Sequence, residues 1–360
     1  MANTFNPVHP GLERRALVAF TALTAITALA ALACTGVMRT AAAQPALTEV
    51  KVSLNAPFDG SNAAFFLAQE KGYYAAEGIA VNMDPSGGSG EAVTRIGGGA
   101  YDFGFADINV LLEFNAKNPG SAGKAVYMLY YRSPLSIASF AKAGINKPSD
   151  LVGKKLGGAL TDGAYKLFPV YASLAGIKPD SVKWEYGDLR LREAMLLKGD
   201  VDAILGFDST MYFGLTKQGI KPADIKFQYY SDMGMDLYGN GIVASKKMLE
   251  TKPNIVKGFV AASAKGWRDA VANPAAAIAA LKKQAPLADE KLEMEKLQWL
   301  IKNQITTPES TADGMGGVRA ARLDKSVAVL SKAFELPGKP TSADVFTNAF
   351  MPPLASRKLP

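Results

Sequence analysis

A short phrase of sequence occurs twice in this chain and constrains its fold more than any other feature. "GAYDFGFAD" spans residues 99–107, and "GDVDAILGFD" spans residues 199–208. In each copy a glycine ends a predicted helix, an aspartate follows within the turn, a short apolar strand comes next, and a second aspartate closes the phrase. The repetition predicts the same helix–turn–strand step in two separate lobes.

The first half of the phrase has an architectural interpretation. Gly99 and Gly199 are expected to take the left-handed backbone conformation that ends a helix. Asp102 and Asp202 are expected to accept hydrogen bonds from backbone N–H groups in the turn. The chemistry of a binding site is therefore expected from the residues that close each phrase.

The segments around the phrases alternate between strand and helix patterns. "LTEVKVSLNA" (47–56) and "IAVNMD" (79–84) are predicted strands, and the helices between them end at glycines such as Gly72 and Gly78. Ser61 or Asn62 can cap the first of these helices. The alternation predicts an α/β fold with a mainly parallel sheet and helices on both faces.

The alternation breaks once, and the break predicts a second lobe. "KAVYMLYY" (124–131) and "LSIASFAK" (135–142) are consecutive strands without a helix between them. The chain is therefore expected to cross into the second lobe near residues 131–134, where Arg132 is the basic candidate. "YGNGIVAS" (238–245) is expected to be the return strand, and helices after residue 254 are expected to pack on the first lobe.

The first 43 residues are predicted to be an export signal. Arg14 and Arg15 precede a long apolar run, and "AAAQ" (41–44) offers the small residues that signal peptidase needs, so cleavage is expected near Ala43. The alternatives are a retained membrane anchor, because the run is nearly long enough to span a bilayer, and a twin-arginine signal. A lipoprotein using Cys34 is disfavoured because Leu32 lies one position later than a lipobox requires.

Removal of the signal excludes several kinds of chemistry. His9 and Cys34 are the only histidine and cysteine of the chain. Without them there can be no disulfide, no thiolate nucleophile, no histidine base and no His or Cys metal ligand. We therefore expect no enzyme activity, no metal and no cofactor. The net charge of +7 comes without Lys/Arg blocks, so no nucleic-acid partner is expected.

A glycine- and serine-rich loop, "PSGGSG" (85–90), lies between a predicted strand and a predicted helix. Backbone N–H groups at such a turn can bind an anion or a carbonyl oxygen. The loop matches neither a dinucleotide fingerprint nor a P-loop. The alternative is a simple turn in which Ser89 caps the helix.

Aspartates follow four predicted strands: Asp59, Asp107, Asp162 and Asp208. Asp107 and Asp208 are each expected to cap a helix, and Asp59 and Asp162 occupy comparable loops. All four also lie where open α/β sheets bind their ligands. Acidic residues at four strand ends would favour a ligand with N–H donors or positive charge.

Aromatic residues lie beside the same loops or the return strand, and together they would suit stacking on a flat ring. Each also fits a place in the core. They are Phe58, Tyr165, Phe207 and Tyr238.

Three longer segments resemble one family in order and spacing: "AFFLAQEKGYYAAEGIAVNM", "GGSGEAVTRIGGGAYDFGFADINVLL" and "INKPSDLVGKKLG". They are similar to periplasmic solute-binding proteins that serve ABC importers of nitrate, sulfonates, taurine and the thiamine pyrimidine precursor. The resemblance implies a type II two-lobed fold, with lobe 1 over 44–131, lobe 2 over 132–236 and a return to lobe 1 over 237–360. It also implies a periplasmic monomer that delivers a small ligand to a permease in the inner membrane.

The resemblance places the ligand at loops of both lobes. The positions that it implies are Asp59, Ser61, Asn62, Ser89, Gly90, Asp107, Thr161, Asp162, Phe207 and Asp208. Tyr238 joins them from the aromatic pattern. One branch of the superfamily, the yeast-type pyrimidine synthases, uses an active-site histidine and a cysteine-rich motif that this chain lacks after signal removal.

The sequence thus favours a binding protein that closes its lobes on a ligand. A nitrogen-bearing or aromatic ring, such as a pyrimidine precursor, fits the acidic and aromatic residues better than a sulfonate or taurine-like anion does. The alternative from another class is an exported enzyme with Asp107 and Asp208 as acid and base. A third alternative is a sensory binding lobe, which differs only in its partner.

Overall fold

The computed structural model describes Ala2 and residues 46–121, 123–159, 162–188 and 191–360. By its contacts the chain divides into Met1–Ala46 and Leu47–Pro360, and the second unit is the subject here. The predicted export signal, apart from Ala2, and Thr161 lie outside the described residues. Among the described residues, no helix combines the length and the apolar character that a membrane crossing requires.

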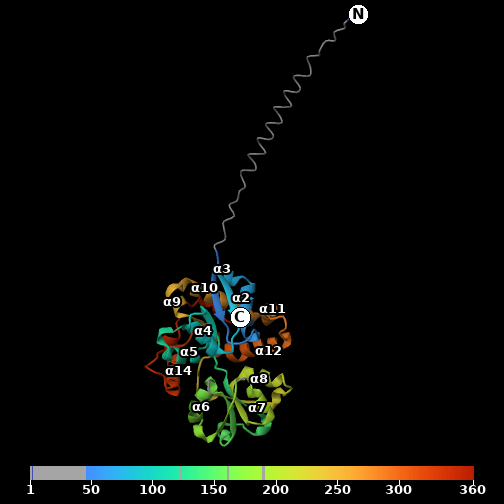
Figure 1. Ribbon diagram of the computed structural model, residues 1–360, viewed down its shortest axis with the longest axis vertical. Coiled ribbons are helices and arrows are strands. Elements are labelled where there is room, and N and C mark those ends of the chain that lie inside the picture. The colour runs from blue at the N-terminus through green and yellow to red at the C-terminus, as the bar shows by residue number, and fades with distance from the viewer. Residues whose placement is uncertain (1, 3–45, 122, 160–161, 189–190) are drawn as a thin grey trace. The chain divides into compact units, whose positions relative to one another are not determined.

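Leu47–Pro360 contains two five-stranded mixed sheets, each covered by helices (Figure 1). The first sheet has the order β2-β1-β3-β10-β4, and β10 alone runs antiparallel to its neighbours. Its strands are β1 (Thr48–Ser53), β2 (Ile79–Asp84), β3 (Phe103–Asp107), β4 (Lys124–Met128) and β10 (Asn240–Ala244). We call this sheet with its helices lobe 1.

The second sheet repeats this arrangement strand for strand, with the order β7-β6-β8-β5-β9 and β5 antiparallel to its neighbours. Its strands are β5 (Leu135–Phe140), β6 (Lys155–Gly158), β7 (Lys183–Tyr186), β8 (Ala203–Phe207) and β9 (Ile225–Tyr229). We call this part lobe 2. The edge strand β9 was not predicted, because its "IKFQY" is mostly half-buried and carries a weak apolar pattern.

The helices of lobe 1 form a thick apolar layer over its sheet. Phe65 of α2 packs edge-to-face on Trp267 of α10, with ring centroids 5.6 Å apart, and Phe103 of β3 stacks on Phe259 at 4.1 Å. The helices are α2 (Ala63–Glu70), α3 (Tyr73–Ala76), α4 (Ser89–Gly97), α5 (Ile108–Lys117), α9 (Lys246–Thr251), α10 (Pro253–Ala272), α11 (Pro274–Gln284) and α12 (Glu290–Leu300). The expected packing of α10, α11 and α12 on lobe 1 is confirmed.

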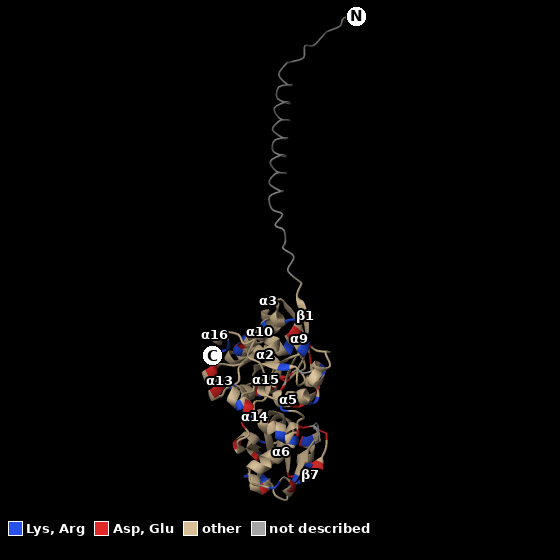
Figure 2. Ribbon diagram, turned by 90° about the vertical axis from the view of Figure 1, so that its left-hand side faces the viewer, with Lys and Arg blue, Asp and Glu red and all other residues tan. Residues whose placement is uncertain are grey.

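Lobe 2 carries three longer helices, α6 (Gly163–Leu174), α7 (Arg192–Lys198) and α8 (Asp208–Thr216). The remaining C-terminal helices are α13 (Pro308–Asp313), α14 (Ala320–Ala333), α15 (Ser342–Val345) and α16 (Leu354–Arg357). Of these, α14 contacts both α5 of lobe 1 and α6 of lobe 2, so the tail does not pack on lobe 1 alone. Lysines, arginines and carboxylates are interspersed over both lobes in the view of Figure 2.

The chain crosses between the lobes twice, over residues 129–134 and again over residues 230–239. Helix α12 ends at Leu300, and a π-helical turn, Ile301–Ile305, continues it. Helix α12 contacts the 3-10 turn Gly60–Asn62 of lobe 1 and also α8 of lobe 2 (Figure 1). This helix therefore lies at the boundary between the lobes.

The first half of the repeated phrase does in both lobes what the sequence predicts. Gly99 and Gly199 have φ of +76° and +79°. The Asp102 carboxylate accepts a hydrogen bond of 3.0 Å from the Lys51 N–H on β1. The Asp202 carboxylate accepts one of 2.8 Å from the Lys155 N–H on β6. Each aspartate thus joins the turn to the neighbouring parallel strand.

Candidate functional site

The four strand-end aspartates follow equivalent strands of the two sheets, β1 and β3 in lobe 1 and β6 and β8 in lobe 2. Asp107 caps α5 by accepting the Asn109 N–H at 2.7 Å, and Asp162 caps α6 by accepting the Ala164 N–H at 2.9 Å. Asp208 differs, because it is the first residue of α8 and the N-cap of that helix is Phe207. The helix-capping prediction is therefore confirmed for Asp107 and wrong for Asp208.

The loop after β1 is shaped by its own side chains. Asp59 caps the 3-10 turn by accepting the Ser61 N–H at 2.9 Å, and it also accepts the Ser61 hydroxyl at 2.6 Å. The buried Asn62 accepts the Asp59 N–H and donates to the Pro57 carbonyl. Asn62 occupies the N-cap position of α2, as one of the two expected residues, but its side chain makes no capping hydrogen bond there. Lys296 of α12 lies 3.5 Å from Asp59.

The glycine–serine loop lies against β3. The Ser89 hydroxyl accepts the Asp107 N–H at 3.0 Å, while Gly88 is the N-cap of α4, so the alternative of Ser89 as cap is wrong. Gly90 lies in the first turn of α4, where its carbonyl accepts the Thr94 hydroxyl and a side chain would meet open space. The loop therefore holds the end of β3 in place and leaves Gly90 uncrowded.

The charges of Asp107 and Asp162, which come from different lobes, interact, and we call these two residues the facing carboxylates. Burial raises the pKa of Asp107 to about 6, and the Asp162 charge raises it further. Burial also raises the pKa of Asp162. The hydrogen bond from the Ala164 N–H and the charge of Arg192, 3.6 Å away, oppose this shift. Two carboxylates that repel each other in this way are stabilised by a group that donates hydrogen bonds or carries positive charge.

Next to this pair, an ion pair joins the lobes directly. Lys166 of α6 lies 2.7 Å and 2.8 Å from the two carboxylate oxygens of Glu113 on α5. Lys117 also bonds Glu113, from one turn along α5. Burial alone would raise the pKa of Glu113, but the two lysines outweigh it and hold that pKa below its usual value. This ion pair therefore links α5 of lobe 1 to α6 of lobe 2.

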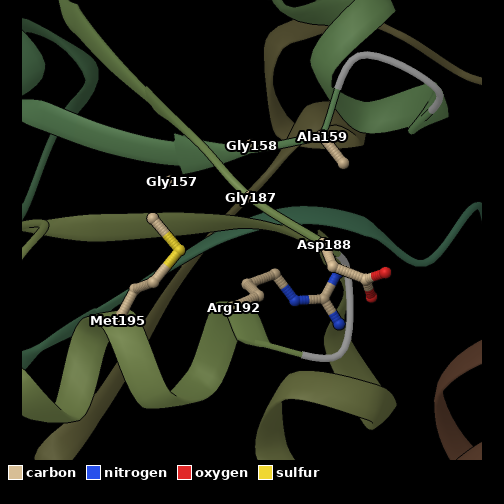
Figure 3. A pocket seen from close by; sticks show the side chains of 7 residues that line it. All are labelled: Gly157, Gly158, Ala159, Gly187, Asp188, Arg192 and Met195. Carbon is tan, nitrogen blue, oxygen red and sulfur yellow. The ribbon is translucent and has the colours of Figure 1, made fainter.

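A narrow pocket of lobe 2 lies at the carboxyl ends of β6 and β7 (Figure 3). The Arg192 guanidinium there donates to the Leu205 carbonyl at 3.0 Å and to Glu193 at 3.2 Å and 3.0 Å. Because this cation is buried and already paired, it is not an open anion site. The pocket is lined by Gly157, Gly158, Ala159, Gly187, Asp188, Arg192 and Met195.

Asp208 is fully buried and receives hydrogen bonds from several directions. Gln304 of the π-helical turn donates to both carboxylate oxygens at 3.1 Å and 3.0 Å, and the Trp299 indole of α12 donates at 3.2 Å. Tyr229 and the Ser209 N–H add bonds of 3.2 Å and 2.6 Å. Burial raises the pKa of Asp208 to about 6, although these donors oppose the shift. Asp208 therefore ties lobe 2 to α12.

Sequence reasoning missed Trp299 and Gln304. Both lie in the helical tail, where the apolar spacing predicts an ordinary helix. The π-helical turn Ile301–Ile305 has no sequence signature of its own, although such turns are frequent at functional sites. Nothing in the spacing indicates that this tail reaches Asp208.

The aromatic candidates lie in packed positions. Tyr238 is fully buried, its hydroxyl donates to Glu309, and the Arg322 guanidinium lies 3.9 Å from its ring centre. Phe58 packs on Phe66 at 4.9 Å, Tyr165 packs on Trp184 at 4.8 Å, and Phe207 is half-buried. At the first crossing, Arg132 lies 4.3 Å from the Tyr229 ring and pairs with Asp232 at 3.4 Å.

Several buried polar atoms at the facing strand ends accept or donate no hydrogen bond among the described residues. They are Asn55 Oδ1 after β1, Asp162 Oδ2 after β6, Gln304 Oε1 in the π-helical turn, and both Oδ1 and Nδ2 of Asn240 at the start of β10. Of these atoms, Asp162 Oδ2 has the charge of Arg192 3.6 Å away. We call these residues the unfilled rim. Buried polar groups normally have partners, so the unfilled rim indicates a place for a polar ligand.

Two mixed α/β lobes, connected by two crossings and facing each other through their strand ends, define the periplasmic binding protein fold. The chain belongs to the NMT1/THI5 like family, which it matches over residues 60–277. Its fold is similar to that of the periplasmic aliphatic sulphonate binding protein SsuA from Escherichia coli. The TM-score is 0.64 and the identity 15%, over 82% of this chain and 91% of that chain.

Two curated relatives have different roles. The riboflavin-binding protein RibY of Chloroflexus aurantiacus is 28% identical over 325 residues, which cover 86% of this chain and 88% of the relative. The 4-amino-5-hydroxymethyl-2-methylpyrimidine phosphate synthase of Legionella pneumophila is 24% identical over 201 residues, which cover 56% of this chain and 62% of the relative.

Proposed function

We propose that this protein is the periplasmic solute-binding component of an ABC-type importer. It captures a small flat ring that carries nitrogen, such as a flavin or a pyrimidine, by closing its two lobes, and it delivers the ring as a monomer to a membrane permease. The export signal predicted before Gln44 and the family membership support this role.

The observation that carries the proposal is the pair of facing carboxylates. Asp107 and Asp162 come from different lobes, and the charge of one raises the pKa of the other. Closing the lobes therefore brings two repelling groups together, and a ligand with N–H donors between them relieves this cost. A ligand of that kind stabilises the closed lobes, which is what a capture mechanism requires.

The ring class rests on the surroundings of this pair. A sulfonate or nitrate offers only acceptor oxygens, and it would meet carboxylates here and a buried arginine that is already paired. The riboflavin-binding relative supports a heteroaromatic ligand of this kind.

Catalysis is not part of the proposal. The Asp208 carboxylate, which would have to serve as acid or base with Asp107, is engaged by Trp299, Gln304 and Tyr229. The synthase relative is named for a pyrimidine phosphate that it makes, so the same ring class remains a candidate for binding without reaction.

The experiment is mass spectrometry of small molecules that copurify with the protein, followed by calorimetry with riboflavin, 4-amino-5-hydroxymethyl-2-methylpyrimidine, taurine and nitrate. We expect stoichiometric binding of one ring compound without turnover. Binding of taurine or nitrate alone would contradict the ring class. Repeated product formation that Asp107→Asn abolishes would contradict the binding role.

A further inference from the structure

Asn240 occupies the start of β10, the strand through which the chain returns to lobe 1. It lies directly opposite Asp107 in the antiparallel pairing of β10 with β3. Its backbone carbonyl accepts the N–H groups of Leu129 and Tyr130 at the first crossing. The residue is therefore fixed at the point where the facing carboxylates and both chain crossings meet.

The side chain of Asn240 is fully buried, and neither its oxygen nor its nitrogen has a hydrogen-bond partner among the described residues. Other buried asparagines of lobe 1 are used structurally. Asn109 donates to the Tyr238 carbonyl at 2.8 Å, and Asn115 donates to the carbonyls of Gly123 and Asp344 at 2.8 Å and 3.0 Å. Burying an amide with both atoms unpaired destabilises a protein, so Asn240 has no evident structural reason to be polar.

We infer that Asn240 is a specificity-determining residue that pairs with the edge of the ligand ring, where a donor nitrogen lies beside an acceptor. A primary amide presents one donor and one acceptor side by side, and its complement is a lactam or an amidine edge. This inference rests on the proposed function and deepens it. The ligand reaches Asn240 when the lobes are apart and is enclosed when they close.

The other unpaired atoms of the unfilled rim also favour a ligand that donates hydrogen bonds. Asn55 and Gln304 each leave an acceptor oxygen without a hydrogen bond, and the second oxygen of Asp162 has only the Arg192 charge 3.6 Å away. The orientation of Gln304 is fixed, because its nitrogen is the atom that bonds Asp208. The unmet need at the rim is therefore mainly for donors, together with the single acceptor that Asn240 Nδ2 requires. A ring with several N–H groups and one adjacent carbonyl or ring nitrogen satisfies both.

The test compares Asn240→Leu with the matched control Asn115→Leu in the full-length mature protein, by calorimetry with riboflavin and with 4-amino-5-hydroxymethyl-2-methylpyrimidine. For the ring that wild type binds, Asn240→Leu is expected to weaken binding about 10- to 100-fold, the loss of two hydrogen bonds. Its melting temperature without ligand is expected to be unchanged or higher. Asn115→Leu is expected to give the reverse pattern, a lower melting temperature with unchanged affinity.

Two further measurements keep the test independent of folding. Asn240→Asp retains the shape but replaces the donor by an acceptor, and it is expected to weaken binding. Wild type is expected to bind more weakly an analogue methylated at the edge nitrogen of the same ring. Unchanged affinity in Asn240→Leu and Asn240→Asp would overturn the role of Asn240 and leave the proposed function intact. Failure of wild type to bind either ring would overturn the proposed ring class, and this inference with it.

Discussion

Asp107 and Asp208 close the two copies of one phrase, yet their surroundings differ. Among the described residues, the Asp107 carboxylate accepts hydrogen bonds from its own helix. It also interacts with the charge of Asp162 in the other lobe. Asp208 instead gathers donors from α12, from the π-helical turn and from β9. The two copies therefore form the same helix–turn–strand step, but their closing aspartates have different partners. Asp208 joins lobe 2 to α12, whereas Asp107 is the residue that the proposed function assigns to the ligand.

Replacing each of the two carboxylates by its amide tests this difference most directly. Asp208→Asn turns an amide nitrogen toward the donors Trp299 and Gln304, so the free energy of unfolding should fall by about 2–4 kcal/mol. Asp107→Asn keeps an equally good helix cap and removes a buried charge that is unfavourable near neutral pH, so it should not lower the free energy of unfolding and should raise it by up to about 3 kcal/mol. Urea unfolding near neutral pH measures both. Equal losses would show that the two sites are used alike.

The two aspartates also predict how stability depends on pH. Burial raises the pKa of each from 3.8 to about 6. Their contribution is therefore fully present below the unfolded pKa and is lost as pH rises through about 6, by up to about 3 kcal/mol for each group. The free energy of unfolding, measured by urea denaturation, should therefore fall by this amount between about pH 4 and about pH 7.5. Asp107→Asn should flatten the profile, and an unchanged profile in that variant would exclude Asp107 as a source.

The first aspartates of the phrase should behave as equals, in contrast to the last ones. Asp102→Ala and Asp202→Ala each remove one hydrogen bond to a backbone N–H on the adjacent strand. Each should lower the unfolding free energy by about 1 kcal/mol, and neither should alter ligand affinity. Thermal melting and calorimetry test both. A loss of affinity in either variant would place the turn in the site.

The smallest expected effect concerns the ion pair between the lobes. Lys166→Met removes the contact from α6 to Glu113, whereas Lys117→Met removes a contact within α5. The first should weaken the closed arrangement by about 1 kcal/mol, and the second by less than about 0.5 kcal/mol. Small-angle scattering with and without ligand reports lobe closure. A larger effect of Lys117→Met on lobe closure would mean that Glu113 stabilises α5 and not the contact between the lobes.

Most of the architecture could be predicted because it depends on local patterns. The alternation of strands and helices, the turn glycines and the missing helix between β4 and β5 all lie within short windows of sequence. The family resemblance is confirmed by the match over residues 60–277 and by the fold. Asp107 was predicted as a helix cap for the same local reason.

The rest of the site depends on contacts across long separations. Trp299 and Gln304 reach Asp208 only because α12 packs against lobe 1 and continues into a π-helical turn. Asn240 looks like an ordinary residue at the start of a strand until the sheet order places it opposite Asp107. No pattern along the chain reports such pairings. The role of the predicted ligand residues stays a prediction.

The position of β10 has a consequence for how the chain folds. All five strands of the lobe 2 sheet come from the continuous segment 135–229, so this lobe can assemble as soon as that segment is available. In the other sheet, β4 pairs with β10 alone among the named strands, and β10 begins at Asn240. Contacts between distant segments form slowly, so the lobe that starts first along the chain should finish last. A nascent or translocating chain would therefore hold an open sheet edge at β3 until residue 240 arrives.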